Sequence, residues 1–152
     1  MSFDEFQTRV AVVGVGGQGC NLVTRLYRAG LKSADTIAVN TDQTHLSITN
    51  AHKKLLIGKE ITRGLGAGGF PQVAMKAAEV SKEDIANALQ GYNLIFLAAG
   101  MGGGTGTGAA PIVARIAKEQ GALVIATVTY PFSLERSRKK TADWGINELN
   151  KV

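Results

Sequence analysis

Three glycine-rich segments are the part of this sequence whose residue types and spacing best suit chemistry. Most of the 19 glycines in the 152 residues lie in residues 14–19, 58–69 and 100–108. Glycine lets a backbone turn sharply and approach a ligand with no Cβ in the way. Where such a turn precedes a helix, the helix N–H groups and the helix dipole attract an anion. The segments therefore predict phosphate-binding loops.

The first segment fits a dinucleotide-binding turn. Residues 14–19 read G-V-G-G-Q-G between an apolar run and a helical pattern, although residues 64–69 fit the same motif without a preceding strand. An NAD(P) site would also need an acid at the end of the next strand to hold the ribose. That end reads Asn40-Thr41-Asp42, so Asp42 comes two residues late. An NAD(P)-binding Rossmann domain of an oxidoreductase stays open as an alternative.

The third segment points to a different ligand. Residues 102–108 read G-G-G-T-G-T-G and also lead from an apolar run into a helical pattern. Two loops facing one crevice predict a longer polyphosphate, bound by backbone N–H groups and by the hydroxyls of Thr105 and Thr107. A P-loop would need Gly-Lys-Ser/Thr, whereas the Gly-Lys pair at residues 58–59 is followed by Glu60. We therefore expect a nucleoside triphosphate site without a P-loop, with Mg²⁺ neutralising part of the phosphate charge.

Short apolar runs alternate with helical patterns along the chain. The runs are continuously apolar, which is typical of parallel strands covered on both faces. We expect one α/β domain over residues 1–152, a Rossmann-like open parallel sheet with helices on both faces and strand order 3-2-1-4-5. Ser81, followed three residues later by Asp84, predicts a capping box. Strands are expected at residues 9–15, 35–39, 53–57, 93–98 and 123–129, helices at residues 17–29, 42–48, 71–79, 81–89, 107–120 and 134–150, and a long loop at residues 58–70.

Composition and charge exclude several functional classes. Apolar residues make up 45% and charged residues 19% of the chain, which supports a real core. No apolar run approaches the roughly 18 residues of a membrane span. The net charge is +5, but the one dense basic cluster, in residues 136–140, is interpreted as a solvated helix face. With no aromatic residues interleaved there, nucleic-acid binding is not expected.

The remaining reactive side chains receive structural interpretations. The acidic start of the chain is unlike a secretion signal, and a single cysteine excludes a disulfide framework, so a cytoplasmic setting fits. We interpret Cys20 as a small buried apolar residue and His45 and His52 as surface residues. No metal-ligating cluster and no catalytic nucleophile is predicted.

Residues 102–111, GGGTGTGAAP, resemble the signature of the tubulin/FtsZ family in its prokaryotic form. Four further segments also resemble the family, and all five occur along the chain in the family's order. They are GVGGQGCN at residues 14–21, similar to the first phosphate loop; Asn40-Thr41-Asp42, similar to the NTD segment; LGAG at residues 65–68 with Pro71, similar to the loop that senses the γ-phosphate; and Pro131-Phe132-Ser133 with Glu135, similar to the stretch that reaches the ribose.

The resemblance implies a GTPase domain of tubulin/FtsZ type. Such a domain binds GTP or GDP, with Mg²⁺ accompanying GTP, and assembles head to tail with other FtsZ-like subunits through its nucleotide face during cell division. The sequence departs from the family pattern at Lys139, where arginine is frequent, at Gly69-Phe70 and at Arg136-Ser137. The nucleotide-binding residues that the resemblance implies are Gly16, Gly17, Gln18, Gly19, Asn21, Asn40, Asp42, Ala67, Gly68, Gly69, Gly102, Gly103, Gly104, Thr105, Gly106, Thr107, Gly108, Pro131, Glu135 and Lys139.

Two parts of the family's machinery have no match in this sequence. The family's site is completed by a long central helix that contacts the base, and hydrolysis uses the acids of an N-x-D-x-x-D loop from the next subunit. The nearest match, at residues 40–45, ends in His45. We therefore expect the N-terminal, GTP-binding part of an FtsZ-like protein, with no catalytic residue of its own and little or no hydrolysis alone. A non-hydrolysing module that caps filament ends stays open as a second alternative.

Overall fold

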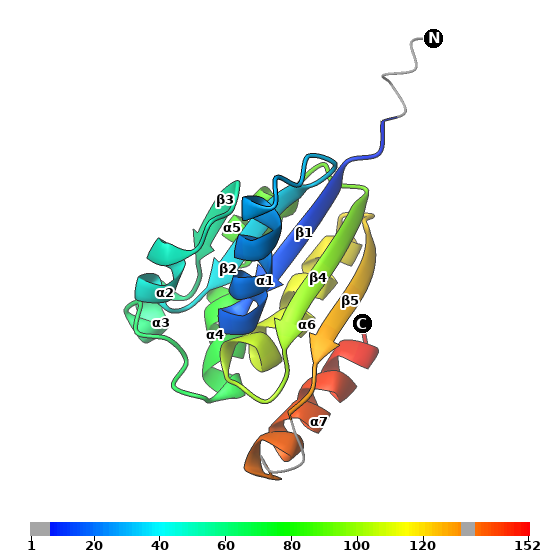
Figure 1. Cartoon of the computed structure of the whole chain (residues 1–152). Helices are drawn as coiled ribbons and strands as arrows, with labels where there is room; N and C mark the ends of the chain where they lie inside the picture. The colour runs from blue at the N-terminus through cyan, green and yellow to red at the C-terminus, as the bar shows by residue number, and fades with distance from the viewer. Residues whose placement is uncertain (1–6, 132–135) are drawn as a thin grey trace.

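The computed structural model describes residues 7–131 and 136–152 of the chain. Within these residues, each strand is followed by one or more helices (Figure 1). The strands are β1 (Val10–Val15), β2 (Asp35–Asn40), β3 (Lys53–Leu56), β4 (Leu94–Gly100) and β5 (Leu123–Thr129). The helices are α1 (Gly16–Arg28), α2 (Gln43–Ile48), α3 (Lys59–Thr62), α4 (Pro71–Val80), α5 (Lys82–Leu89), α6 (Thr105–Glu119) and α7 (Arg136–Asn150).

The strands form one parallel sheet in the order β3-β2-β1-β4-β5. The predicted fold class and strand order are therefore confirmed. From β1 the chain builds outward to β3 at one edge, and then returns to place β4 on the other side of β1. Open α/β sheets bind ligands beside such a switch point, at the carboxyl ends of the strands.

The main core lies between the sheet and the helices behind it in Figure 1. Val13, Ile37 and Leu97 project from the central strands and are almost completely buried, as are Val113 and Ile116 of α6. Burying a side chain of this size stabilises the fold by about 1.5–3 kcal/mol. A smaller cluster on the opposite face of the sheet lies under α1 and α2. Its buried members are Cys20, Val23, Ala38 and Leu46.

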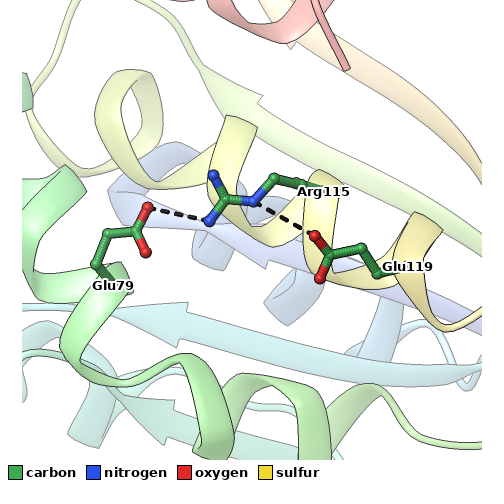
Figure 2. A network of polar contacts seen from close by, with 3 residues as sticks. All are labelled: Glu79, Arg115 and Glu119. Atoms are coloured by element: carbon green, nitrogen blue, oxygen red, sulfur yellow. Dashed lines mark hydrogen bonds and ion pairs between the residues drawn. The ribbon is translucent and has the colours of Figure 1, made fainter.

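Helices α4 and α6 pack closely because one contact between them has no room for a side chain. A Cβ at Gly108 would lie 2.1 Å from the carbonyl oxygen of Pro71. On the outer surface of the same pair, the Arg115 guanidinium lies 3.0 Å from Glu79 of α4 and 3.8 Å from Glu119 of α6 (Figure 2). These ion pairs are exposed to solvent, so the tight packing at Gly108 stabilises the pair of helices more than the ion pairs do.

One face of β5 and of the amino-terminal part of β4 is not covered by a helix within the described residues, whereas α1 packs on the carboxyl end of β4. In Figure 1, α1 lies in front of β1, whereas β4 and β5 face the viewer directly. Parallel pairing brings Phe96 beside Ile125 and Leu94 beside Leu123 on this face. Leu123 is 65% exposed, Ile125 44% and Phe96 37%. The prediction that helices cover both faces therefore holds except over β5 and the amino-terminal part of β4.

The long loop predicted at residues 58–70 contains a short helix, α3, that the sequence pattern did not indicate. Four residues are too few to display a helical period. Both flanking residues adopt the left-handed conformation, with φ of 63° at Gly58 and 56° at Arg63. This conformation begins and ends the single turn, so the expectation of a structureless loop was wrong at residues 59–62.

The predicted capping box at Ser81 and Asp84 is also wrong. Ser81 does precede α5, but its side chain makes no cap hydrogen bond. The Ser81 hydroxyl oxygen accepts instead from the N–H of Gly58, at 2.8 Å. The predicted start of the last helix, Leu134, lies outside the described residues, and α7 begins at Arg136 in the described part.

Candidate functional site

A cavity of about 740 Å³ opens at the switch point of the sheet, within the range of about 300–1,000 Å³ usual for ligand pockets. Residues that follow β1, β2, β4 and β5 all contribute to its walls. Twelve of the residues predicted to bind nucleotide line it: Gly17, Gln18, Asn40, Asp42, Ala67, Gly68, Gly69, Gly103, Gly104, Thr105, Gly106 and Pro131.

The first glycine segment places the N-terminus of α1 at the cavity. Helix α1 begins at Gly16 with no side-chain cap and no acid in its first turn. The first N–H groups of a helix have no partner inside the helix, so this end can bind an anion. A Cβ at Gly16 would lie 2.8 Å from the backbone nitrogen of Gly106. The first and third glycine segments therefore touch each other.

The third glycine segment places a second helix N-terminus at the same cavity. Helix α6 begins at Thr105 after Gly104, again with no side-chain cap and no acid in its first turn. Gly103, Gly104 and Thr105 line the cavity with Gly106. Two helix ends thus meet at one cavity, as the two-loop interpretation of the sequence requires.

Thr107 does not face the cavity, which corrects the prediction that its hydroxyl donates to a phosphate. Thr107 is fully buried, and its hydroxyl oxygen accepts from the N–H of Gly102 at 2.9 Å. Its methyl group lies on the side of α7, where a Cβ at Gly145 would approach it to 2.5 Å. Thr107 therefore shapes the turn before α6 from inside the protein.

The second glycine segment closes one side of the cavity. Ala67, Gly68 and Gly69 line it, and a Cβ at Gly104 would lie 2.9 Å from the backbone nitrogen of Phe70. The segment is fastened to the end of β2, because Gly66 N–H donates to the Thr41 carbonyl at 3.1 Å. All three glycine segments are thus in direct contact around one space.

The residues after β2 connect these segments. The Asn40 side chain is buried, and its Oδ1 accepts from the N–H of Thr41 at 2.8 Å and of Asp42 at 3.2 Å. Asp42 caps α2 by accepting from the N–H of His45 at 3.0 Å. Asp42 therefore has a structural role beside the cavity, although the other oxygen of its carboxylate is available to a ligand.

Several predicted residues lie away from the cavity lining. Gly19 packs against β4, where its Cβ would meet the Ala98 carbonyl at 2.5 Å, and it borders a second cavity of about 280 Å³ with Asn21. Lys139 does not line the first cavity, whereas its neighbour Arg138 does. Glu135 lies outside the described residues. The other predicted residues that are absent from the lining are Gly16, Gly102, Thr107 and Gly108.

His45 is the clearest functional candidate that sequence reasoning missed. It lines the cavity, and its Nε2 lies 3.1 Å from Oδ1 of Asn21. A Cβ at Gly17 would lie 3.2 Å from its Cε1. His45 is half-buried, so its interpretation as a surface residue overlooked its place at the cavity, whereas His52 is exposed as expected.

Arg138 and Tyr130 also line the cavity and were not predicted. Arg138 brings a cation, and the backbone around it packs on Gly102, where a Cβ would lie 3.2 Å from the Arg138 carbonyl. The Tyr130 hydroxyl donates to Asp143 at 2.7 Å, and this hydrogen bond raises the pKa of Tyr130. At neutral pH the ring is therefore uncharged beside the cavity.

Cys20 lies under the first glycine segment and is completely buried, as predicted. Burial raises the pKa of its thiol to about 11, although the thiol contacts the Asn40 amide at 3.8 Å and the Val39 carbonyl at 3.7 Å. The protonated thiol is a poor nucleophile at neutral pH. Cys20 therefore acts as a packing residue.

An open parallel sheet with two uncapped helix ends at its switch point defines an α/β domain of Rossmann type with an anion-compatible cavity. The model of the Tubulin/FtsZ family, GTPase domain, matches residues 9–152 of this chain. The chain belongs to the tubulin/FtsZ family. The oxidoreductase alternative is not favoured.

Relatives and solved structures agree with this membership. Cell division protein FtsZ 2 of Methanocaldococcus jannaschii is 54% identical over 150 residues, which cover 98% of this chain and 40% of the relative. Cell division protein FtsZ 2 of Pyrococcus furiosus is 53% identical, with 97% and 38% covered. A solved FtsZ dimer from M. jannaschii superposes with a TM-score of 0.94 at 48% identity, covering 97% of this chain and 43% of that one.

A more distant structure shares the fold. The GTPγS-bound protofilament of CetZ2 from Haloferax volcanii matches with a TM-score of 0.74 at 26% identity, covering 88% of this chain and 46% of that one. The chain thus spans about two fifths of the length of the curated relatives it matches. No helix among the described residues is both long and apolar enough to span a bilayer.

Proposed function

We propose that this chain binds GTP or GDP in the switch-point cavity, with the phosphates against the glycine segments. The observation that carries the proposal is the meeting of α1 and α6, two uncapped helix N-termini without acids in their first turns, at one cavity. Their N–H groups need acceptors, and phosphate oxygens carry the negative charge that the helix dipoles favour. An FtsZ-type nucleotide site is the family function that this arrangement suits.

Each segment has a distinct part in the proposed site. Gly17 and Gln18 would bind the phosphates from the side of α1, and Gly103 to Gly106 from the side of α6. Ala67, Gly68 and Gly69 would close over the terminal phosphate, because they line the cavity next to the N-terminus of α6. Pro131, which lines the cavity, would lie along the ribose.

We propose that Mg²⁺ arrives with GTP and is held chiefly by phosphate oxygens and water. Among the described residues, no group of three or more His, Cys, Asp or Glu side chains is placed to hold a metal ion. Asp42 is the one carboxylate among the described residues of the cavity lining. Mg²⁺ is commonly bound through one or two carboxylates together with substrate phosphates, which suits a site with a single acid.

The relatives place this domain in a longer protein, and we propose the same for this chain. It would be the N-terminal part of an FtsZ-like cell-division GTPase in the cytoplasm that assembles head to tail with like subunits through its nucleotide face. The apolar face of β4 and β5 supports this proposal, because Leu123 and Ile125 are exposed side by side there, as in surfaces that contact other polypeptide. Further polypeptide of the longer protein would cover them.

Hydrolysis by the chain alone is proposed to be slow or absent. Attack of water on the terminal phosphate needs a group that orients the water. Asp42 is the carboxylate at the described cavity, and one of its oxygens is already bonded to the N–H of His45. The chain's own residues would therefore bind and orient the nucleotide, and a neighbouring subunit would supply the groups that activate water.

Calorimetric titration of the chain with GTP, GDP, ATP and NAD tests the proposal. We expect GTP and GDP to bind at one site per chain, and ATP and NAD to bind far more weakly or not at all. Tight NAD binding without guanine nucleotide binding would overturn it. Turnover of GTP by the isolated chain at the rate of assembled family members would overturn the proposal on hydrolysis.

A further inference from the structure

Thr41 joins two of the glycine segments through its side chain and its backbone. It is fully buried, and its hydroxyl oxygen lies 2.7 Å from the hydroxyl oxygen of Thr105, the first residue of α6. Thr105 lines the cavity, whereas Thr41 lies behind it. We propose that Thr41 is a positioning residue, which directs the Thr105 hydroxyl toward a bound phosphate and links that contact to the second glycine segment. This inference rests on the proposed nucleotide site.

The hydroxyl pair has two possible directions, and an anion selects one of them. Each threonine hydroxyl has one proton to donate and two lone pairs that accept. When Thr41 donates to Thr105, the Thr105 proton is left for an acceptor in the cavity. A phosphate oxygen is such an acceptor, and a chain of hydroxyls in which each donates to the next is strengthened by mutual polarisation. Thr41 thus makes Thr105 a better donor without touching the ligand.

The backbone of Thr41 fixes the position of its side chain. Its N–H donates to Oδ1 of Asn40 at 2.8 Å, so the turn after β2 is held from inside. Its carbonyl oxygen accepts from the N–H of Gly66 at 3.1 Å and from the Thr62 hydroxyl at 3.3 Å. Gln43 adds a further contact between the end of β2 and the second glycine segment, because its N–H donates to the Gly64 carbonyl at 2.9 Å.

These contacts give a continuous path from α6 to the second glycine segment. Occupation of the cavity by a phosphate fixes the Thr105 hydroxyl, which fixes the Thr41 hydroxyl and the peptide that holds residues 62–66. The Gly104 contact with Phe70 provides a second meeting point of the same two segments. Removal of either hydroxyl should therefore loosen the second segment, because Thr41 links Thr105 to Thr62 and Gly66.

A double-mutant cycle on GDP affinity tests the inference. Thr41→Val removes the hydroxyl with little change of shape, Thr41→Ser keeps it, and Thr105→Val removes its partner. Thr36→Val is the matched control, because Thr36 is equally buried at the other end of β2 and its hydroxyl is 2.9 Å from His52. The GDP dissociation constant and the thermal midpoint are measured for each variant, and hydrogen exchange of residues 62–69 is followed without nucleotide.

Thr41→Val should weaken GDP binding about tenfold, the factor expected from one weakened hydrogen bond to a charged group. Thr41→Ser and Thr36→Val should stay within about twofold of the original affinity. Thr105→Val should weaken GDP binding at least as much as Thr41→Val, because it removes the phosphate donor itself. The double variant should be no weaker than Thr105→Val, because both changes interrupt one chain of hydroxyls. The inference would be overturned if the fold-losses of GDP affinity in the two single variants multiplied in the double variant, or if Thr41→Val bound GDP with unchanged affinity.

Hydrogen exchange separates failure of this inference from failure of the proposed function. Thr41→Val and Thr105→Val should both accelerate exchange in residues 62–69, and Thr36→Val should not. If the original chain binds no guanine nucleotide, the proposed function fails, and the phosphate contact of Thr105 fails with it. Accelerated exchange in Thr105→Val would still support the link between the segments, whereas exchange that responds only to Thr41→Val would overturn it.

Discussion

Replacing Gly103 by alanine should separate nucleotide binding from folding. Gly103 is exposed and lines the cavity, and apart from its two neighbours in the chain no described residue comes within 4 Å of the position that a Cβ would take. Its φ lies outside the left-handed region, so alanine fits its backbone. The added methyl group therefore enters open space, and that space is where the proposed phosphates lie.

The two expected effects have opposite signs. A methyl group at Gly103 would keep a phosphate oxygen from reaching the backbone N–H groups before α6, at the cost of about one charge-assisted hydrogen bond. Such a bond contributes about 1.5–3 kcal/mol, so the GDP dissociation constant should rise roughly 10- to 150-fold. Replacement of a glycine whose conformation suits alanine stabilises a fold by about 0.4–1 kcal/mol. For a chain of this length the thermal midpoint should rise by about 1–4 °C.

Calorimetric titration with GDP and thermal denaturation without nucleotide are the two assays. Gly108→Ala is the contrasting control, because its Cβ would lie 2.1 Å from the Pro71 carbonyl and would force α4 and α6 apart. That variant should lose about 1–3 kcal/mol of stability. Unchanged GDP affinity in Gly103→Ala would refute the placement of phosphates at this loop. A lower thermal midpoint in Gly103→Ala would refute the claim that its methyl group meets open space.

Three further predictions concern residues outside the proposed phosphate site. Burial raises the pKa of Cys20 from 9.0 to about 11, so the folded state holds this proton more tightly than the unfolded state does. The free energy of unfolding should therefore fall by up to about 3 kcal/mol as pH rises from 9 to 11. Cys20→Ala should flatten that fall in urea unfolding at a series of pH values, and an equally steep fall would contradict the assignment. Tyr92→Phe removes a 2.6 Å hydrogen bond to Asp35 at the amino ends of the strands, and should cost about 1–2 kcal/mol of stability while GDP affinity stays unchanged. Arg115→Gln breaks the exposed ion pairs of Figure 2 and should cost less than about 1 kcal/mol, less still at high salt; a larger, salt-independent loss in chemical denaturation would count against a surface role.

The order of the strands could be predicted because each buried strand is a short, continuously apolar run that alternates with a helical pattern. The three segments of the cavity could be predicted for a related reason. Each depends on local glycine content and on its place after a strand or before a helix, and both can be read from the sequence. Six of the ten predicted glycines, Gly17 and Gly104 among them, accordingly line the cavity.

Side-chain directions could not be predicted in the same way. The helix after the third glycine segment was expected to begin at Thr107, but α6 begins at Thr105. Two residues of helix turn the side-chain direction by about 200°, so Thr107 points into the core while Thr105 faces the cavity. An error of two residues in the helix start was enough to misplace one hydroxyl.

Residues brought in by tertiary contacts were missed for a different reason. His45 reaches the cavity because α2 packs beside α1, where its ring meets Asn21. One local signal was available: Asp42, three residues before His45, has the spacing of a helix N-cap, which fixes the direction of the helix that carries His45. Arg138 and Lys139 are adjacent, and the phase of α7 decides that Arg138 lines the cavity.

The central claim is that guanine nucleotide binds at the switch point, against the N-termini of α1 and α6. The most direct test is to titrate the isotope-labelled chain with GDP and to follow every assigned backbone amide by NMR. We predict that the largest shifts fall in residues 16–18, 66–69 and 103–106, with smaller shifts at His45. Shifts that cluster instead at the exposed face of β4 and β5, or a folded chain whose amides do not respond to GDP, would contradict the claim.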